Sequence, residues 1–243
     1  MSKRLSKAEY AQMMKEIRRK MNETLDDHIL DLIRDQEEFI SFLDLYSRMN
    51  YTVANALLIH AANPNATAIK SFAKWNELGI RVKNNEKGFY ILEPNGTYTR
   101  PDGSTATSFK PKMVYDISQT DAQAIKPGQY NLKDVRDSLV YGNPGAYEGM
   151  NLGDSIVYAC RTFGEQNDNF TRACAEYATK HRFGVVPNSF QEDVVNYFLS
   201  TTAAAAALNW TREMENIYRP IVRKIEYGLR IKAKENKADE QQG

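Results

Sequence analysis

The chain has 243 residues, of which 42% are hydrophobic and 26% are charged, and its formal net charge is +1. These are ordinary values for a globular protein, and a charge so close to zero excludes a polycation that binds nucleic acid over its whole surface. The two cysteines, Cys160 and Cys174, exclude a disulfide framework, and no apolar run has the length of a membrane span. We therefore expect a cytoplasmic protein that does not bind membranes.

The first quarter of the chain has the pattern of helices, from Ala8 to about Ala62. Apolar residues recur three and four positions apart, which is typical of amphipathic helices. Thr24 is expected to cap the start of one helix. A further helix is expected from about Thr52, and Pro64 should end it, because the residue before a proline disfavours helical geometry.

The middle of the chain predicts strands, because apolar or alternating runs are separated by the turn sequences Pro94-Asn95-Gly96 and Pro101-Asp102-Gly103. The continuous apolar run at residues 89–92 suits a central strand. Residues 113–118 alternate in the way expected of a sheet with one buried face. The predicted strands are 80–83, 88–93, 97–100, 105–110 and 112–117.

After Gln119 the strand pattern fades into loop-like sequence, and helices resume near Leu152 and continue to about Lys234. The predicted fold class is α+β, with N-terminal helices, a small antiparallel sheet in the middle and a helical C-terminal half. We expect three parts: a domain of helices and sheet at 1–125, a helical domain at 126–236, and a disordered tail at 237–243.

Enzyme motifs are missing from the sequence. None of the three histidines lies four residues from another, which rules out an HExxH zinc site, and the cysteines lack CxxC spacing. No GxSxG elbow is present. Paired carboxylates such as Asp26-Asp27 read as solvated helix faces. We predict no catalytic residues, no metal ligands and no cofactor, and hence a protein that is not an enzyme.

The segment from Lys70 to Lys112 differs from the rest, because it has eight cations and four acids, a net +4 in a chain whose total is +1. Six aromatic residues lie in the same segment. Cations that follow a phosphate backbone and rings that stack on bases are the combination that binds single strands. An alternative stays open: Phe72 and Trp75, three apart, are also the pattern of a short helix packed on a sheet, with Lys70 and Lys74 in solvent.

Four sequence blocks between about residues 39 and 120 resemble the N-terminal domain of ArdC-type antirestriction proteins. These blocks lie in "YTVANALLIHAANPNATAIKSFAKWNELGIRVKNNEKGFYILEP" and "FKPKMVYDISQT". The matching residues are Tyr51, Asn55, Leu58 and Ile59; Pro64, Ala66 and Thr67; Trp75, Gly79, Val82, Lys83, Glu86, Lys87 and Gly88; and Val114, Asp116, Ser118, Gln119 and Thr120.

The resemblance implies single-stranded DNA binding. Family members occur on plasmids, conjugative elements and phages, where some protect incoming DNA from host restriction. Ile80 replaces an expected Arg and Asn85 an expected Gly. The family often continues into a zincin-like metallopeptidase domain with HExxH, which this C-terminal half lacks. That half is either a degenerate zincin-like domain or an unrelated helical cap, and the stretch "FTRACAEYATKH" lies where a metal-binding helix would fall.

The composition of this segment and the family resemblance together predict a nucleic-acid-binding site. The predicted phosphate contacts are Lys70, Lys74, Arg81, Lys83 and Lys87, and the predicted stacking rings are Trp75, Tyr51 and Tyr90, each with a place in the core as its alternative. Asn55 is expected to tie its helix to the sheet. Residues 116–120 should shape the turn after the last strand, and Gly88 should serve the backbone geometry before the central strand.

The leading hypothesis is a non-enzymatic single-stranded DNA-binding protein of a mobile element or phage, which acts in antirestriction or in the transfer of incoming DNA. The first alternative is an inhibitor that binds a host defence or replication enzyme through a surface with Trp210, Tyr218 and Tyr227. The second is a metal-dependent hydrolase with an unrecognised carboxylate site. The sequence pattern does not distinguish DNA from RNA as the ligand, and it predicts no particular oligomeric state.

Overall fold

The computed structural model describes residues 5–122, 129–187 and 204–240. Contacts divide the chain into two compact units, which we call the first unit (Met1–Asp31 and Tyr51–Ile125) and the second unit (Leu32–Asn50 and Lys126–Gly243). Because contacts alone do not show which segments fold independently, the domain boundaries predicted above stay a prediction.

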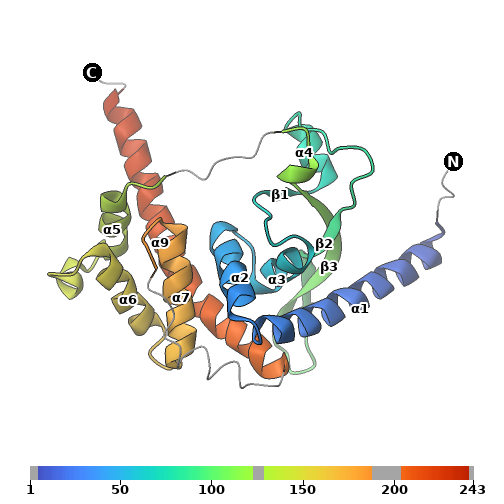
Figure 1. The fold of residues 1–243 in the computed structure, drawn as a ribbon, viewed down its shortest axis with the longest axis horizontal. Coiled ribbons are helices and arrows are strands. Elements are labelled where there is room, and N and C mark those ends of the chain that lie inside the picture. The colour runs from blue at the N-terminus through green and yellow to red at the C-terminus, as the bar shows by residue number, and fades with distance from the viewer. Residues whose placement is uncertain (1–4, 123–128, 188–203, 241–243) are drawn as a thin grey trace. The chain divides into compact units, whose positions relative to one another are not determined.

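The secondary structure confirms the α+β class (Figure 1). The first unit contains α1 (Lys7–Leu32, except for its last residue), α3 (Val53–Ala62), β1 (Ile69–Lys70), α4 (Phe72–Glu77), β2 (Phe89–Thr99), β3 (Thr105–Asp116) and the 3-10 helix η1 (Ile117–Gln119). The second unit contains α2 (Gln36–Arg48), α5 (Leu132–Val140), the 3-10 helix η2 (Pro144–Tyr147), α6 (Leu152–Phe163), α7 (Asn169–Arg182) and α9 (Ala204–Glu240). No helix among the described residues is both long and apolar enough to cross a membrane.

The predicted limits of α3 are confirmed. Its N-cap is Thr52, whose hydroxyl accepts a hydrogen bond from the backbone N–H of Asn55 at 3.3 Å, and the helix ends at Ala62, two residues before Pro64. The predicted cap at Thr24 is wrong, because this residue lies inside the continuous helix α1. The helical periodicity on both sides of Thr24 outweighs its preference for a cap.

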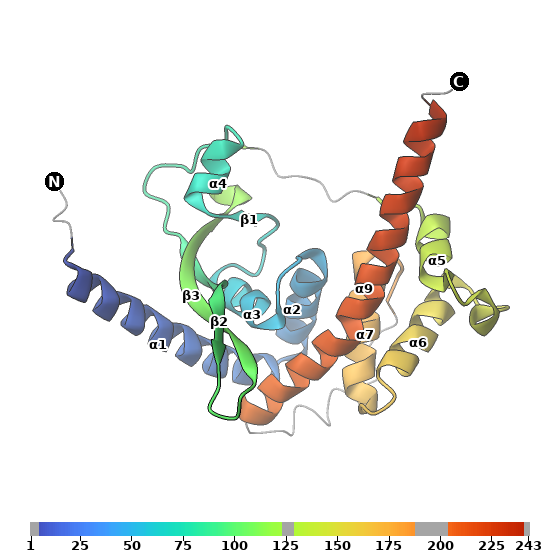
Figure 2. The same ribbon diagram turned by 180° about the vertical axis from the view of Figure 1, so that it is seen from behind.

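The sheet has three antiparallel strands in the order β1-β3-β2 (Figures 1 and 2). The predicted strands 88–93 and 97–100 are one strand, β2, and those at 105–110 and 112–117 are one strand, β3. The register shifts between Pro94 and Thr97, which shows that a turn-like sequence lies within β2 as an irregularity.

Two strand predictions are wrong. Residues 80–83 form no strand, and only Val82 makes an isolated bridge, to Thr120. Residues 89–92 lie in β2 at an edge, and β3 is the central strand. The two-residue strand β1 was not predicted, because two residues are too short to show a period.

The buried face of the sheet carries Ile69, Ile91, Val114 and Asp116, none of which is more than 7% exposed. Asp116 is the polar member, and backbone donors satisfy its carboxylate. Its Oδ1 accepts from the N–H groups of Thr67 at 2.8 Å and Ala68 at 3.0 Å. Its Oδ2 accepts from the N–H of Ser118 at 2.9 Å, and the Thr120 hydroxyl donates to the carbonyl oxygen of Ile117 at 2.7 Å. The prediction that residues 116–120 shape the turn is therefore confirmed.

In the second unit, helices pack around three aromatic rings. The ring centroids of Phe39, Phe170 and Trp210 lie 5.4–5.7 Å apart, on α2, α7 and α9. Helix α6 begins at Leu152 as predicted, whereas α5 lies in sequence that predicts a loop. Helix α9 passes the expected end near Lys234, and residues 188–203 and 241–243 of the predicted helices and tail lie outside the described residues.

Candidate nucleic-acid interface

The face of the sheet opposite to Val114 and Asp116 carries rings and a cation. In an antiparallel pair, residues directly opposite each other have side chains on the same face. Lys70 pairs with Tyr115 and Tyr90 pairs with Met113. Since Met113 and Tyr115 alternate with the buried residues of β3, all four side chains lie on the other face.

Helix α4 adds a further ring to this face. The ring centroid of Phe72 lies 6.4 Å from that of Tyr115 at an interplanar angle of 64°, and the Tyr115 hydroxyl lies 3.4 Å from the Met113 sulfur. Phe72 is 53% exposed and Met113 is 41% exposed. We call Lys70, Phe72, Tyr90, Met113 and Tyr115 the outer face. It presents accessible rings beside a cation.

Gly88 makes room for the outer face. A Cβ at this position would lie 2.8 Å from the Met113 Cγ and 2.9 Å from the Tyr115 Cζ, and also 2.8 Å from the carbonyl oxygen of Val114. These distances are far below ordinary contact, and the backbone oxygen has no freedom to retreat. Glycine is needed at position 88 because a side chain would block this close approach. Its φ is not positive, so backbone geometry alone does not require glycine here.

Trp75 is not accessible from the outer face. Its side chain is 0% exposed, and its indole N–H donates a hydrogen bond to the carbonyl oxygen of Tyr115 at 3.0 Å. The Nζ of Lys70 lies 5.5 Å from the centroid of the Trp75 ring. Base stacking on Trp75 is unavailable in this structure, and the alternative of a helix pinned to the sheet is the one observed.

Tyr51 and Asn55 hold the sheet in place. The Tyr51 hydroxyl donates to the carbonyl oxygen of Ile69 at 3.1 Å, and burial raises the pKa of Tyr51. The Asn55 side chain donates to the carbonyl oxygen of Leu92 at 2.9 Å and accepts from its N–H at 2.7 Å. The prediction that Asn55 ties its helix to the sheet is confirmed, and Tyr51 has a similar structural contact with β1.

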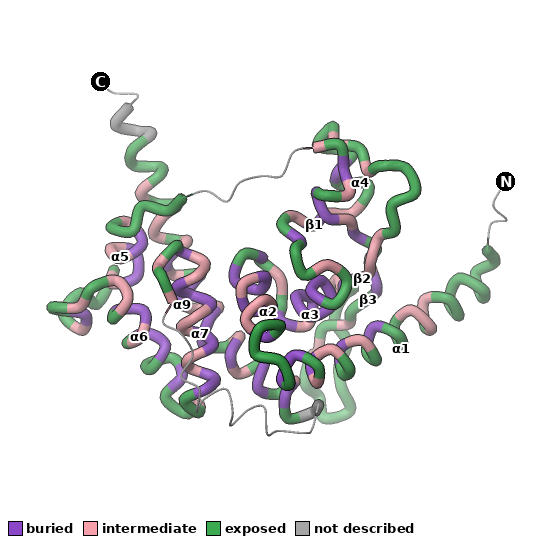
Figure 3. Tube along the Cα trace, viewed as in Figure 1, coloured by how far each residue is buried: buried purple, intermediate pink, exposed green. Residues whose placement is uncertain are grey.

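Tyr90 connects the outer face with α1. Burial raises its pKa, and the neighbouring hydroxyls of Tyr10 and Tyr115 raise it further. Tyr10 belongs to the exposed N-terminal half of α1 (Figure 3). Nearer the tip of the hairpin, the Arg18 guanidinium donates to the carbonyl oxygen of Phe109. Tyr90 therefore lies where the helix, the edge strand and the outer face meet.

The predicted phosphate contacts lie on β1, α4 and the 79–88 loop. Lys74 forms an exposed ion pair with Glu77 at 2.7 Å, and the Lys83 ammonium donates to the carbonyl oxygen of Ser118 at 2.9 Å. Arg81 and Lys87 are exposed, and their side-chain cations make no hydrogen bond or ion pair with a described residue. The structure thus leaves these two cations accessible to an anionic partner.

Gln119 fixes the loop that carries these cations. Its amide nitrogen donates to a carboxylate oxygen of Glu86 at 2.9 Å and to the carbonyl oxygen of Lys87 at 3.0 Å, and its amide oxygen accepts from the N–H of Asp116 at 3.0 Å. Asn85 has φ of 66°, in the left-handed region that glycine favours and asparagine tolerates. The replacement of the expected Gly by Asn85 therefore preserves the turn.

The second unit contains no metal-binding group among its described residues, and throughout the described chain no three His, Cys, Asp or Glu residues gather as ligands. The stretch "FTRACAEYATKH" forms most of α7. In it, the Glu176 carboxylate pairs with the Lys180 ammonium at 2.6 Å. Cys174 is fully buried, and burial raises the pKa of its thiol well above the ordinary value. The described residues of this helix do not fit a metal.

A serine, a histidine and an aspartate do meet in the second unit. The Nδ1 of His181 lies 2.6 Å from the Ser47 hydroxyl, and its Nε2 lies 3.4 Å from the Asp44 carboxylate. Ser47 is completely buried and its hydroxyl donates to the carbonyl oxygen of Asp44 at 2.8 Å. Because that hydroxyl is neither exposed nor free to donate to the histidine, the cluster fastens α2 to α7 rather than presenting a nucleophile.

The aromatic surface proposed for an inhibitor is only partly present. Trp210 is 5% exposed and Tyr218 is 4% exposed, so both belong to the core of the second unit. Tyr227 is 61% exposed. The predicted surface position of Trp210 and Tyr218 is wrong, because helical spacing does not say which side of α9 is covered.

The fold and the outer face define an α+β protein with an accessible aromatic and basic sheet surface. Residues 7–130, just over half of the chain, match the model of the N-terminal domain of the anti-restriction factor ArdC. The chain belongs to this family. No curated protein matches it.

Two solved structures are similar in fold. The Mn(II)-bound crystal structure of the antirestriction protein ArdC from the R388 plasmid has a TM-score of 0.53 and 13% identity, covering 82% of this chain and 97% of that one. The metal-free crystal structure of the same protein has a TM-score of 0.47 and 14% identity, covering 73% and 86%. The Mn(II)-bound match extends beyond the family domain, so the fold likeness takes in part of the C-terminal half.

Proposed function

We propose that this chain is a non-enzymatic protein that binds single-stranded DNA through the outer face of its first unit. The observation that carries the proposal is the contact between Phe72 and Tyr115, whose rings lie 6.4 Å apart on an exposed face beside Lys70. Rings accept any base on their faces, at about 1–3 kcal/mol per base, and they need bases that are not paired in a duplex.

The cations around this face supply the second half of the interaction. Arg81 and Lys87 meet phosphates directly, while Lys83 exchanges its contact with Ser118, and Lys74 its contact with Glu77, for a phosphate. The ion pair of Lys74 is exposed and contributes little, about 0–1 kcal/mol, so its exchange costs little. Binding then releases counterions from the strand and weakens as salt rises. Weak sequence specificity follows, since neither stacking nor phosphate contact reads base edges.

Membership of the family supports a role in antirestriction, in which a mobile element or phage protects or transfers its incoming DNA as a single strand. The R388 protein with a similar fold is named as an antirestriction protein and comes from a plasmid. In this proposal the same role rests on the strand-binding face of the first unit. A cytoplasmic location is part of the proposal.

Fluorescence anisotropy with a labelled oligonucleotide tests this function. We expect the full chain to bind a single strand of mixed sequence at about 50 mM salt, with affinity falling steeply at higher salt. A duplex of the same sequence should compete poorly, and an RNA strand in the same competition measures the preference for DNA. The Lys83→Glu plus Lys87→Glu variant should bind weakly with its fold retained. Absence of single-strand binding by the wild type at low salt would refute the proposal.

A further inference from the structure

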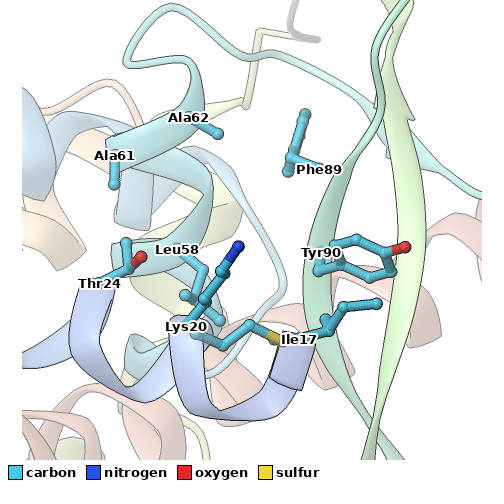
Figure 4. Close-up of a pocket in the computed structure, with 9 residues that line it drawn as sticks. Ile17, Lys20, Thr24, Leu58, Ala61, Ala62, Phe89 and Tyr90 are labelled. Atoms are coloured by element: carbon cyan, nitrogen blue, oxygen red, sulfur yellow. The ribbon is translucent and has the colours of Figure 1, made fainter. Parts of the chain in front are cut away.

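An open pocket in the first unit lies next to Tyr90, between α1, α3 and β2 (Figure 4). Its volume is about 480 Å³, within the range of sites that hold small organic ligands. The walls are mostly apolar, and they are formed by Ile17, Met21, Leu58, Ala61, Ala62, Phe89 and the ring of Tyr90. Two polar side chains, Lys20 and Thr24, complete the lining.

The two polar groups of the pocket have no partner within the described part of the chain. Figure 4 shows the Lys20 side chain extending into the pocket and the Thr24 hydroxyl directed to the same space. Neither side chain makes a hydrogen bond or ion pair with a described residue. The Lys20 charge acts on Glu16, whose pKa is lowered mainly by the hydrogen bond with Arg19 and to a lesser degree by Lys20. The Lys20 ammonium is therefore available to an anionic ligand.

The pocket and the outer face share one residue, Tyr90. Tyr90 pairs with Met113 on the outer face and also lines the pocket. A ligand that follows the outer face past Tyr90 arrives at a space with aromatic and apolar walls and a cation. This combination suits a flat ring joined to a phosphate and does not suit a purely apolar or purely anionic molecule.

We propose that this pocket receives one unstacked base of a bound single strand, with Lys20 contacting the adjoining phosphate. This inference rests on the proposed function and adds a defined subsite to it. The base leaves the row of rings at Tyr90 and enters between Phe89 and Leu58. The subsite would hold the strand in one register relative to the sheet, which stacking alone does not do.

A pocket-filling variant provides the test. Ala61 lines the pocket and is exposed, so Ala61→Leu reduces its volume without removing a core contact. The matched control is Ala233→Leu, the same change at an exposed helical position of the second unit. We expect Ala61→Leu to weaken binding of a natural strand about tenfold. Binding of a strand made of abasic sugars should be the same for this variant and the wild type, and the control should change neither.

A second pair of variants tests the subsite without altering its shape. Lys20→Glu should weaken binding and lower its dependence on salt concentration more than Lys15→Glu does, because both lysines are exposed on α1 but only Lys20 lines the pocket. Circular dichroism checks that both variants keep the wild-type helix content. Equal effects of the two charge changes would contradict the proposal.

The outcomes separate the subsite from the proposed function. If the wild type binds single strands and Ala61→Leu binds them equally well, the subsite is wrong and the proposed function stands. If the wild type binds no single strand, both fail. If thymidine monophosphate alone saturates the pocket and Ala61→Leu abolishes only that binding, the pocket takes free nucleotides, which contradicts its place on the strand.

Discussion

The indole N–H of Trp75 donates a hydrogen bond to the carbonyl oxygen of Tyr115, at 3.0 Å. One residue therefore holds α4 against the backbone of β3. Trp75 is completely buried, so this tryptophan is not available for base stacking, whereas Phe72, at the start of the same short helix, is 53% exposed.

Trp75→Phe is expected to destabilise the first unit while leaving the strand-binding surface in place. The substitution keeps a ring in the core but leaves the carbonyl of Tyr115 without its donor, which costs about 1–3 kcal/mol. Urea denaturation measures the free energy of unfolding, and anisotropy below the transition measures binding. A variant of unchanged stability that binds DNA weakly would show that the indole contacts the strand.

Phe72→Ala is expected to give the reverse pattern. The ring is 53% exposed, so its removal has little effect on the free energy of unfolding, but it takes away one stacking surface and lowers the binding free energy by about 1–3 kcal/mol. The matched control is Tyr141→Ala, which removes a ring that is 79% exposed in the second unit. Equal affinities of the two variants would contradict a role for Phe72.

Gly88→Ala is expected to damage both stability and binding. The added methyl group would meet the Val114 carbonyl oxygen at 2.8 Å and the Tyr115 ring at 2.9 Å, so strand and ring must shift, at a cost of about 1–3 kcal/mol. Gly145→Ala serves as control, because a Cβ at Gly145 meets nothing within 4 Å and its φ is not positive. Thermal unfolding and anisotropy of both variants measure the two effects, and wild-type behaviour of Gly88→Ala would disprove the close approach.

Glu93 is expected to make the hairpin sensitive to acid. Its pKa lies below the ordinary value because the Lys112 ammonium hydrogen-bonds to its carboxylate, with Lys110 adding a smaller effect at 3.6 Å. A carboxyl group whose pKa is lowered in the folded state stabilises that state above its unfolded pKa of about 4.3, and this contribution is lost as pH falls below it.

The Glu93→Gln variant measures this contribution. It should lose about 0.2–1 kcal/mol of unfolding free energy at pH 7, a value limited by the exposure of the pair, and the difference from wild type should vanish near pH 3. The control is Glu148→Gln, an exposed carboxylate of the second unit that has no ion pair with a described residue. A difference that persists in acid would show that the effect is not electrostatic.

Local patterns predicted the parts of the fold that depend on neighbours in sequence. Periodicity placed the helices, Thr52 and Pro64 marked the limits of α3, and an isolated polar residue in an apolar helix identified Asn55 as a tie to the sheet. The strand order and β1 were missed, because pairing between distant segments has no local signal. The turn-like residues near Pro94 predict two strands where the structure has one, because the long hairpin tolerates an irregularity at this position.

The predicted nucleic-acid contacts stay a prediction, and the structure shows only that the Trp75 ring among them is buried. The helical spacing of an aromatic residue shows that it belongs to one face of its helix but does not show whether that face is buried. The predicted DNA contacts therefore include Trp75, which is buried, and do not include Tyr115. The alternation of residues in β3 could have identified Tyr115. Asp116 accepts hydrogen bonds from buried backbone N–H groups, so it lies on the buried face, and its neighbour Tyr115 lies on the other face. The pocket beside Tyr90 depends on residues 17–24 of α1, which lie 66–73 positions earlier in the chain, and no local sequence pattern relates segments so far apart.

The most direct test of the account is to locate the bound strand by photo-crosslinking. A single strand that carries 5-bromodeoxyuridine is bound to the full chain at low salt and irradiated, and the attached peptides are identified by mass spectrometry. We predict adducts on the outer face, at Phe72, Tyr90, Met113 or Tyr115. Adducts confined to the second unit, for example at the exposed Tyr227, would contradict the account.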